Sequence, residues 1–128
     1  MHHSATVVHE LLRAVGARDL DAVLRCFSPG ATWQNVPHPA AVGHDGIRAM
    51  LGPILARSSR VQWDVTTEAY SDDRAWVERV DRFWIDGSEY AVRCNAVIEF
   101  DSHAGLITEF RDYVDVGEWR ARLGDVEF

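Results

Sequence analysis

The chain has few cysteines, no long apolar run and an excess of negative charge, and each of these excludes a class of protein. Its two cysteines, Cys26 and Cys94, stand apart without metal-binding or redox spacing, which favours a reducing, cytoplasmic setting. No apolar run approaches the roughly 20 residues of a membrane span, and no secretory signal is recognisable. The net charge of −7 repels phosphate backbones, so we expect neither nucleic-acid nor membrane partners.

Metal-ligand spacing and low-complexity sequence are missing as well. The six histidines are scattered and form no H-x-H or H-x-x-x-H pair, so we expect no metal site. No repeat or linker interrupts the 128 residues, whose length suits a single domain over residues 1–128. A hydrophobic fraction of 47% and five tryptophans exclude a disordered chain.

Hydrophobic periodicity places most helices early in the chain and most strands late. Helical spacing, with Ser4 and Asp19 as candidate N-caps, predicts helices over 4–17, 20–27, 47–56 and 117–123. Alternation predicts strands over 31–35, 61–70, 77–85, 89–100 and 106–114. Ser28-Pro29-Gly30 reads as a stop between elements, and Asp86-Gly87 as a hairpin turn. This order indicates an α+β fold, in which a curved, mostly antiparallel sheet wraps around N-terminal helices and leaves an interior pocket.

Three charged residues fall in otherwise apolar rows of two predicted strands. One face of strand 77–85 carries Arg79 and Asp81 between apolar side chains, and one face of strand 106–114 carries Asp112. Charges in a protein interior are costly unless they are paired. We therefore expect Arg79 to lie between the two carboxylates at the bottom of an apolar pocket.

Such a triad has a structural and a chemical interpretation. It can be a buried ion cluster that only satisfies its own charges. Alternatively, two carboxylates bridged by one guanidinium cannot titrate independently, so one remains an anion while the other holds a proton. That pair supplies a general base and a general acid, which suits attack by water on a substrate whose leaving oxygen is protonated.

Other side chains are candidates for the same pocket. Trp33 and Asn35 share a face of strand 31–35, where Asn35 can fix a water through its donor and acceptor. The plainer interpretations are a core tryptophan and a turn asparagine before Val36-Pro37. A further set is core by pattern and includes candidates for lining an apolar ligand site, namely Trp63, Phe83, Met50, Leu51 and Ile98.

Four short motifs together resemble the limonene-1,2-epoxide hydrolases. They are W-Q-N-V-P at 33–37, A-V-G at 41–43, E-R-V-D at 78–81 and R-D-Y-V-D at 111–115, within a resemblance over residues 20–123. The resemblance implies the cone-shaped NTF2-like fold and hydrolysis of an epoxide to a vicinal diol without a cofactor. It also implies a homodimer formed through the exposed sheet face, with which outward aromatics such as Trp76 and Trp84 agree.

The resemblance also implies a role for each site residue. Arg79 and Asp81 match the family's arginine and acid, Asp112 matches its base, and Asn35 matches its water-binding asparagine. Trp33 stands where the family has a tyrosine. Because an indole N–H only donates, whereas a phenol donates and accepts, we expect the water to sit differently here. The apolar candidates for the lining favour a bulky apolar epoxide.

Two further functions stay open at this point. The same fold hosts ketosteroid-isomerase-like and polyketide-cyclase-like enzymes, in which an aspartate moves a proton beside a carbonyl. The predicted first helix lacks the tyrosine that such an isomerase uses as an oxyanion donor. The third possibility is a non-catalytic binding module whose triad only shapes a pocket, because fold alone does not decide function.

Overall fold

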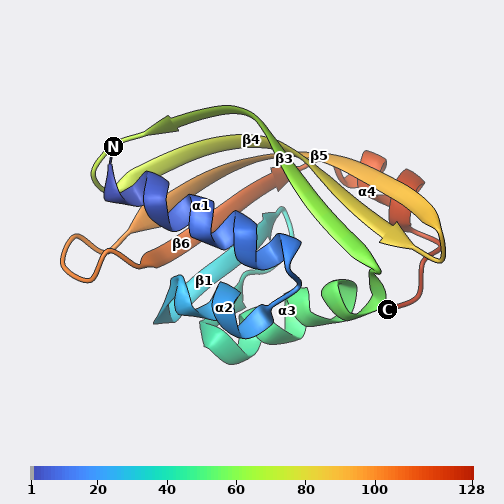
Figure 1. The fold of residues 1–128 in the computed structure, drawn as a ribbon, viewed down its shortest axis with the longest axis horizontal. Coiled ribbons are helices and arrows are strands. Elements are labelled where there is room, and N and C mark those ends of the chain that lie inside the picture. The colour runs from blue at the N-terminus through green and yellow to red at the C-terminus, as the bar shows by residue number, and fades with distance from the viewer. Residues whose placement is uncertain (1) are drawn as a thin grey trace.

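Helices occupy the inside of a curved sheet in the computed structural model, which describes residues 2–128. Figure 1 shows the sheet arching over α1 (His3–Gly16) and α2 (Leu20–Arg25), with α3 (Gly43–Arg57) beside them and α4 (Val116–Leu123) at the far end. Helix α1 packs on β3 and β4, α3 packs on β1, and α2 contacts both α1 and α3. In residues 2–128 no helix is both long and apolar enough to cross a membrane.

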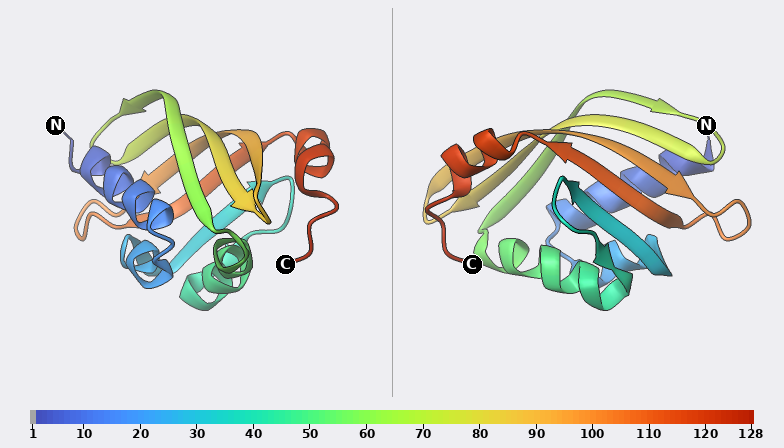
Figure 2. Two further views of the ribbon diagram at one scale, coloured as in Figure 1. Left: turned by 45° about the vertical axis from the view of Figure 1, so that its right-hand side comes forward. Right: turned by 180° about the vertical axis from the view of Figure 1, so that it is seen from behind.

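The sheet has six strands and does not close. Its order is β2-β1-β6-β5-β4-β3, and every neighbouring pair is antiparallel except β1 and β6, which are parallel. Both views in Figure 2 show the resulting shell with its open side towards the helices. The predicted α+β, NTF2-like fold is confirmed. The strands are β1 (Phe27–Val36), β2 (Ala41–Val42), β3 (Arg60–Tyr70), β4 (Arg74–Ile85), β5 (Ser88–Phe100) and β6 (Ile107–Val114).

The last four predicted strands, over 61–70, 77–85, 89–100 and 106–114, pair in chain order and form the larger part of the sheet. Strands β4 and β5 meet at Asp86 and Gly87, whose φ angles of 51° and 81° are those of a tight hairpin turn with two left-handed residues. This turn fixes the register of the pair, in which Arg79 lies opposite Cys94. Along β4, burial alternates strictly from Ala75 to Ile85. The inner row therefore holds Arg79 and Asp81 among apolar side chains, as the sequence predicts.

The first helix begins differently from the prediction. Its N-cap is His2, and Ser4 is buried within the first turn instead of capping it. The Ser4 hydroxyl donates to the carbonyl of Ser71 at 2.6 Å, in the turn between β3 and β4. A long-range hydrogen bond therefore uses the group that local capping would need.

The first strand is longer than the predicted span of 31–35. Strand β1 begins at Phe27 and runs through Ser28-Pro29-Gly30, which was expected to be a stop. Its register with β6 shifts between Phe27 and Thr32, so the proline lies in an irregular stretch where a ladder donor is not needed. Strand β2 was not expected, because its two residues are too few to show a periodicity.

A second irregularity changes the face assignment at the start of β6. The register with β5 shifts between Glu99 and Phe100, and Ile107 is fully buried, although the alternation that turns Asp112 inwards would turn Ile107 outwards. From Phe110 to Asp112 the predicted alternation holds. The bulge therefore leaves the inward position of Asp112 unchanged.

Candidate active site

Three charged side chains are buried where β4 and β6 face the helices. Arg79 is 2% exposed, Asp81 4% and Asp112 3%. Strand β5 lies between the two strands, and its small inner residues leave room for the Arg79 side chain to reach across. Ala96 of β5 pairs with Asp112, and Cys94 pairs with Arg79. The backbone ladders thus fix the spacing of all three charged groups.

Arg79 bridges the two carboxylates, as the strand faces predict. Its Nε donates to Asp81 Oδ1 at 2.9 Å, and its Nη2 donates to Asp81 Oδ2 at 2.9 Å and to Asp112 Oδ2 at 2.7 Å. Two parallel N–H donors to one carboxylate form the strongest type of ion pair in proteins. Asp81 is therefore held more firmly than Asp112.

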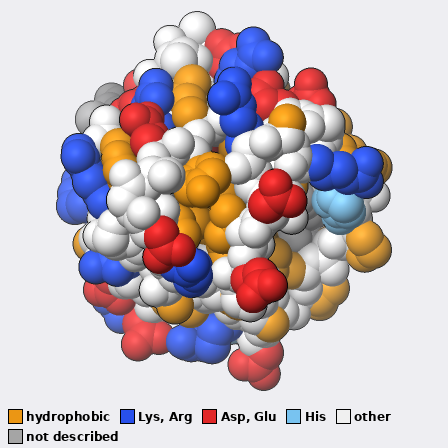
Figure 3. All heavy atoms as spheres, turned by 90° about the vertical axis from the view of Figure 1, so that its right-hand side faces the viewer, with side chains coloured by type: hydrophobic (Ala, Val, Ile, Leu, Met, Phe, Trp, Pro, Cys, Tyr) orange, Lys and Arg blue, Asp and Glu red, His pale blue; other side chains and the backbone are white. Residues whose placement is uncertain are grey.

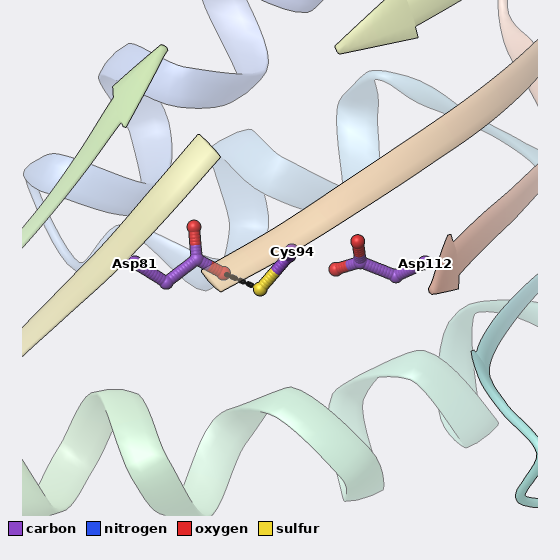
Figure 4. A group of neighbouring side chains, drawn as sticks. All are labelled: Asp81, Cys94 and Asp112. Carbon is purple, nitrogen blue, oxygen red and sulfur yellow. Dashed lines mark hydrogen bonds between the residues drawn. The ribbon is translucent and has the colours of Figure 1, made fainter. Parts of the chain in front are cut away.

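The remaining polar atoms of the cluster are unequally satisfied. Cys94 Sγ donates to Asp81 Oδ2 at 3.3 Å, and Figure 4 shows this thiol standing between the two carboxylates. Among the described residues, Asp112 Oδ1 and Arg79 Nη1 have no hydrogen-bond partner although both atoms are buried. Because an unpaired buried polar atom is unfavourable, these two atoms are where a polar ligand or water gains most by binding.

The environment shifts the titration of this cluster. Burial raises the pKa of Asp112 above its usual range, and the Asp81 charge adds to the effect, while Arg79 opposes it. Burial disfavours the charged form of Arg79, but the two carboxylates outweigh it and raise its pKa, so the guanidinium stays charged. Trp63 and Phe110 also face the guanidinium, at 4.8 and 5.7 Å from the ring centroids, which stabilises the cation further.

An apolar cavity of about 360 Å³ opens beside the cluster. Its wall includes Asp81, Cys94 and Asp112, and residues of β1, β3, α3 and α4, His38 and the C-terminal Phe128 also line it. Figure 3 looks onto this side of the molecule and shows hydrophobic side chains in a hollow that charged side chains surround. The volume is at the lower end of the range for small-molecule sites, which are typically about 300–1,000 Å³ and mainly apolar.

The donor set that could hold a metal does not fit one well. Oxygen and sulfur atoms of Asp81, Cys94 and Asp112 lie within 4.8 Å of one another. However, the Arg79 guanidinium already donates to both carboxylates and adds a positive charge at the same place. Burial also raises the pKa of the Cys94 thiol, which therefore resists forming a thiolate ligand. The cluster is better suited to proton transfer than to cation binding.

Comparison with known proteins identifies the family. A SnoaL-like domain matches residues 8–110. The chain belongs to the SnoaL-like domain family. A putative polyketide cyclase from Xanthomonas campestris pv. campestris has a TM-score of 0.80 and 20% identity, over 94% of this chain and 96% of that one.

Other solved structures similar to this SnoaL-like chain carry different descriptions. An LEH-like epoxide hydrolase from M. tuberculosis has a TM-score of 0.76 and 23% identity, over 94% of this chain and 89% of that one. An epoxide hydrolase/cyclase-like enzyme of pyran ring formation in the polyether salinomycin has a TM-score of 0.79 and 16% identity, over 90% and 92%. At these identities the likeness shows the NTF2-like fold and leaves the reaction to be argued from the site.

Two of the predicted site residues come from β1. In the parallel ladder, Asn35 lies directly opposite Asp112, so both belong to one end of the cavity. Among residues 2–128, the acceptor for the Asn35 amide is a weak one, the sulfur of Met50 at 3.8 Å from Nδ2. It is therefore available to a water or ligand beside Asp112.

Trp33 is both a wall of the cavity and a potential donor. Its ring stacks on Phe110 at 4.1 Å and on Phe27 at 5.5 Å between centroids, and the residue is 2% exposed. Its Nε1 is buried without a hydrogen-bond partner in the described part of the chain. The expected position beside Asn35 at the cavity is thus observed, while the role of the N–H stays a prediction.

The predicted lining is largely present, with one correction. Trp63, Phe83, Met50 and Leu51 line the cavity. Ile98 does not, because it is 1% exposed and packs in the hydrophobic core on the stretch of β5 beyond Ala96. The same strand face thus supplies core at one end and cavity wall at the other, and alternation alone does not separate the two.

Sequence reasoning missed several residues of the site. Alternation placed Cys94 on the inner face of β5, but nothing in the sequence linked it to Asp81; only the register of β4 with β5 does so. Trp119 and Val116 of α4 and His38 after β1 also line the cavity. Their contribution depends on how distant elements pack, and no short-range pattern reports it.

Proposed function

We propose that this SnoaL-like chain is a cofactor-independent epoxide hydrolase, which adds water to an apolar epoxide and releases a vicinal diol. The observation that carries the proposal is Arg79, which holds two buried carboxylates at the wall of an apolar cavity. The ordered motifs shared with limonene-1,2-epoxide hydrolases support it, and so does the fold shared with an LEH-like epoxide hydrolase.

The proposed reaction is a single addition step. Asp112 Oδ1 accepts a proton from water while the water oxygen bonds to one ring carbon and the bond from that carbon to the ring oxygen breaks. Asp81 donates a proton to the departing ring oxygen, which becomes the second hydroxyl. The attacked carbon inverts, and no bond forms between enzyme and substrate. Asn35 Oδ1 orients the water by accepting a hydrogen bond from its second proton, and the Trp33 N–H donates to one lone pair of the water oxygen, which leaves the other lone pair for the attack.

The hydrogen bonds and burial of the pair correspond to the state that follows these proton transfers. A raised pKa makes ionised Asp112 a stronger base towards water. Arg79 stays charged and stabilises whichever carboxylate is ionised. The hydrogen bonds to Asp81 are those of an ionised carboxylate, which is its state just after it has donated a proton. A proton must therefore return from Asp112 to Asp81 before the next turnover.

A panel of cyclic, terpene-like and fatty-acyl epoxides, with diol formation followed by chiral chromatography, tests the activity. A single turnover with excess enzyme in H₂¹⁸O tests the mechanism. Direct attack by water places ¹⁸O in the diol of the first turnover, whereas an ester intermediate delivers ¹⁶O from a carboxylate first. Unlabelled first-turnover diol would overturn the single-step mechanism, and no diol from any epoxide would overturn the function.

The strongest alternative is proton transfer beside a carbonyl. A carboxylate with a raised pKa is also a suitable base for an enone or polyketide substrate, and a putative polyketide cyclase shares the fold. An enone-isomerisation assay, run beside the epoxide panel, separates the two reactions. If neither substrate class turns over but an apolar ligand raises the melting temperature, the chain is a binding module.

A further inference from the structure

The cavity wall contains a thiol that the proposed reaction does not use. Cys94 is 5% exposed and lines the cavity from β5, opposite Arg79 in the ladder. Its Sγ lies 3.3 Å from Asp81 Oδ2 and 3.7 Å from the carbonyl oxygen of Val92. A thiol has one proton to donate, and the nearer, charged acceptor is the stronger one. The S–H is therefore directed at Asp81, and the dashed line in Figure 4 marks this contact.

The thiol is a lasting donor rather than a nucleophile. Burial raises the pKa of Cys94 far above its usual range, and the charges of Asp81 and Asp112 add to this effect. The reactive form of cysteine is the thiolate, which this environment suppresses. Cys94 thus keeps its proton throughout the pH range in which a hydrolase is assayed.

The thiol makes the two carboxylates unequal. Asp81 accepts from two nitrogens of Arg79 and from Cys94, so both of its oxygens are occupied. Asp112 accepts from Arg79 alone, and its Oδ1 is buried without a partner among residues 2–128. Each donor to a carboxylate favours its ionised form.

Few other ionisable groups reach this part of the cavity. The ionisable groups on the wall are Asp81, Cys94 and Asp112 of β4, β5 and β6, together with His38 after β1 and the terminal carboxylate of Phe128. Arg79 contacts the two aspartates from behind the wall. Strand β3, α3 and α4 line the cavity with uncharged side chains only. Of the groups that touch Asp81, Cys94 is therefore the one whose removal leaves the Arg79 ion pairs intact.

We infer that Cys94 is a positioning residue, whose thiol orients the Asp81 carboxylate and stabilises its ionised form. Its catalytic consequence rests on the proposed function. As Asp81 gives its proton to the ring oxygen, negative charge develops on Oδ2, where the S–H already points. The thiol thereby stabilises the charge that Asp81 gains as it gives up its proton, without itself touching the substrate.

Three substitutions at one position test this role. Cys94→Val removes the donor at similar volume, Cys94→Ala removes it with less bulk, and Cys94→Ser replaces it with a stronger O–H donor. A structural role predicts that Ser and Val are both harmful or both neutral. The positioning role predicts opposite effects on the pH profile. Cys26→Val is the matched control, because Cys26 is equally buried but its thiol faces the Ala22 carbonyl in α2.

In kcat/KM against pH, the alkaline limb reports loss of the single proton that the Asp81–Asp112 pair holds in the active enzyme. We expect this limb to move up by roughly half a unit to one unit in Cys94→Val and Cys94→Ala, the size expected for one weak hydrogen bond to a charge. It should move down in Cys94→Ser and stay in place in Cys26→Val. Unchanged limbs in all three Cys94 variants of an active enzyme would overturn the inference and leave the proposed function intact.

A measurement without substrate keeps the two proposals separable. In protein labelled with ¹³C at aspartate carboxyls, the resonance lost in Asp81→Asn identifies Asp81. At one fixed pH, that resonance should move in one direction in Cys94→Val and Cys94→Ala and in the other direction in Cys94→Ser, because the hydrogen bond to the carboxylate is lost or strengthened. If no epoxide is hydrolysed but these shifts occur, the proposed function fails and the inference about Cys94 stands. If the resonance does not move, the inference fails.

Discussion

At the scale of the residue, the cluster depends on charge that is buried and shared. Arg79, Asp81 and Asp112 carry a net charge of −1 when both carboxylates are ionised, and each is almost fully shielded from solvent. Replacing one aspartate with asparagine keeps its shape and leaves Arg79 with one carboxylate. Such variants should therefore fold, while losing half of an acid–base pair.

We expect Asp112→Asn and Asp81→Asn each to lower diol formation by roughly 100-fold or more, the usual contribution of one acid–base group. Turnover and far-UV circular dichroism should be measured together. Asp64→Asn is the control, since Asp64 pairs with Arg82 outside the cavity wall. Near-normal turnover in either cavity variant would remove that residue from the mechanism.

The raised pKa of Asp112 has a consequence for stability. Because its folded-state pKa lies above its unfolded value, its contribution to stability is complete below about pH 4 and is lost as the pH rises through the folded pKa. Asparagine does not ionise. The free energy of unfolding of Asp112→Asn, relative to wild type, should therefore increase from pH 4 to pH 7, as measured by urea unfolding at fixed ionic strength.

Asp86 provides a control for this measurement, because its pKa is shifted in the opposite direction from that of Asp112. The Arg57 hydrogen bond and charge lower the pKa of exposed Asp86, so its contribution to stability is lost only as the pH falls below about 4. Asp86→Asn should show a flat difference over pH 4–7. A flat difference for Asp112→Asn too would mean that Asp112 ionises as readily in the folded protein as in the unfolded chain.

Substitutions of Trp33 test how the water is held. Its N–H has no partner among the described residues, and its ring is stacked in the wall. We expect Trp33→Tyr to retain or raise turnover of small cyclic epoxides, because a phenol can both donate and accept. Trp33→Phe should lower kcat more than it raises KM. If Phe matches wild type in kcat, residue 33 is only a wall, and Asn35 and Asp112 hold the water alone.

At the scale of the element, two helices begin with the same kind of N-cap, an aspartate, but have different neighbours. Asp19 caps α2 by accepting from Ala22 N at 3.0 Å, and Asp115 caps α4 by accepting from Glu118 N at 3.1 Å. Helix α2 packs on α1 and α3, away from the cavity lining, whereas α4 supplies Trp119 to it. Loss of one cap typically costs about 1 kcal/mol.

The two caps should therefore separate stability from binding. Asp19→Ala should lower the free energy of unfolding by about 1 kcal/mol and leave KM unchanged. Asp115→Ala should loosen α4 and raise KM for a responsive epoxide. Urea unfolding and steady-state kinetics on both variants check this. Equal KM values in the two variants would mean that α4 does not shape the substrate site.

Elements with strict periodicity were predictable, and those defined by long-range pairing were not. The alternation in 77–85 set the inner face of β4 and with it Arg79 and Asp81. The bulge that carries Pro29 within β1 depends on its register with β6, and two-residue β2 exists only through pairing with β1. The cavity contribution of α4 and the thiol contact of Cys94 arise in the same way, from partners distant in the sequence.

At the scale of the whole molecule, the convex sheet face is the surface through which we expect a homodimer. Trp76 on β4 is 41% exposed and Tyr113 on β6 is 48% exposed, on the side away from the helices. Trp84, also expected there, is half-buried beneath the Arg60 guanidinium, 4.5 Å from its ring centroid. A stable dimer buries about 800 Å² per partner, which needs several strands of this face.

Sedimentation velocity over a range of concentrations tests the dimer. Trp76→Glu should shift the distribution towards monomer, because it places a charge in the middle of an apolar contact. Val42→Glu is the control, since Val42 is 65% exposed but lies on β2 at the opposite edge of the sheet. A monomer at every concentration in the wild type would refute the homodimer.

The parallel contact between β1 and β6 has a consequence for engineering. It sets Asn35 beside Asp112 through backbone hydrogen bonds, which side-chain substitutions do not remove. Helices α3 and α4 meet the cavity with side chains alone, among them Leu51, Ile54 and Trp119. Saturation libraries at those three positions should therefore change which substrates are accepted while the proton-transfer machinery stays fixed. Directed evolution of regioselectivity and enantioselectivity can begin on the helices and leave the sheet untouched.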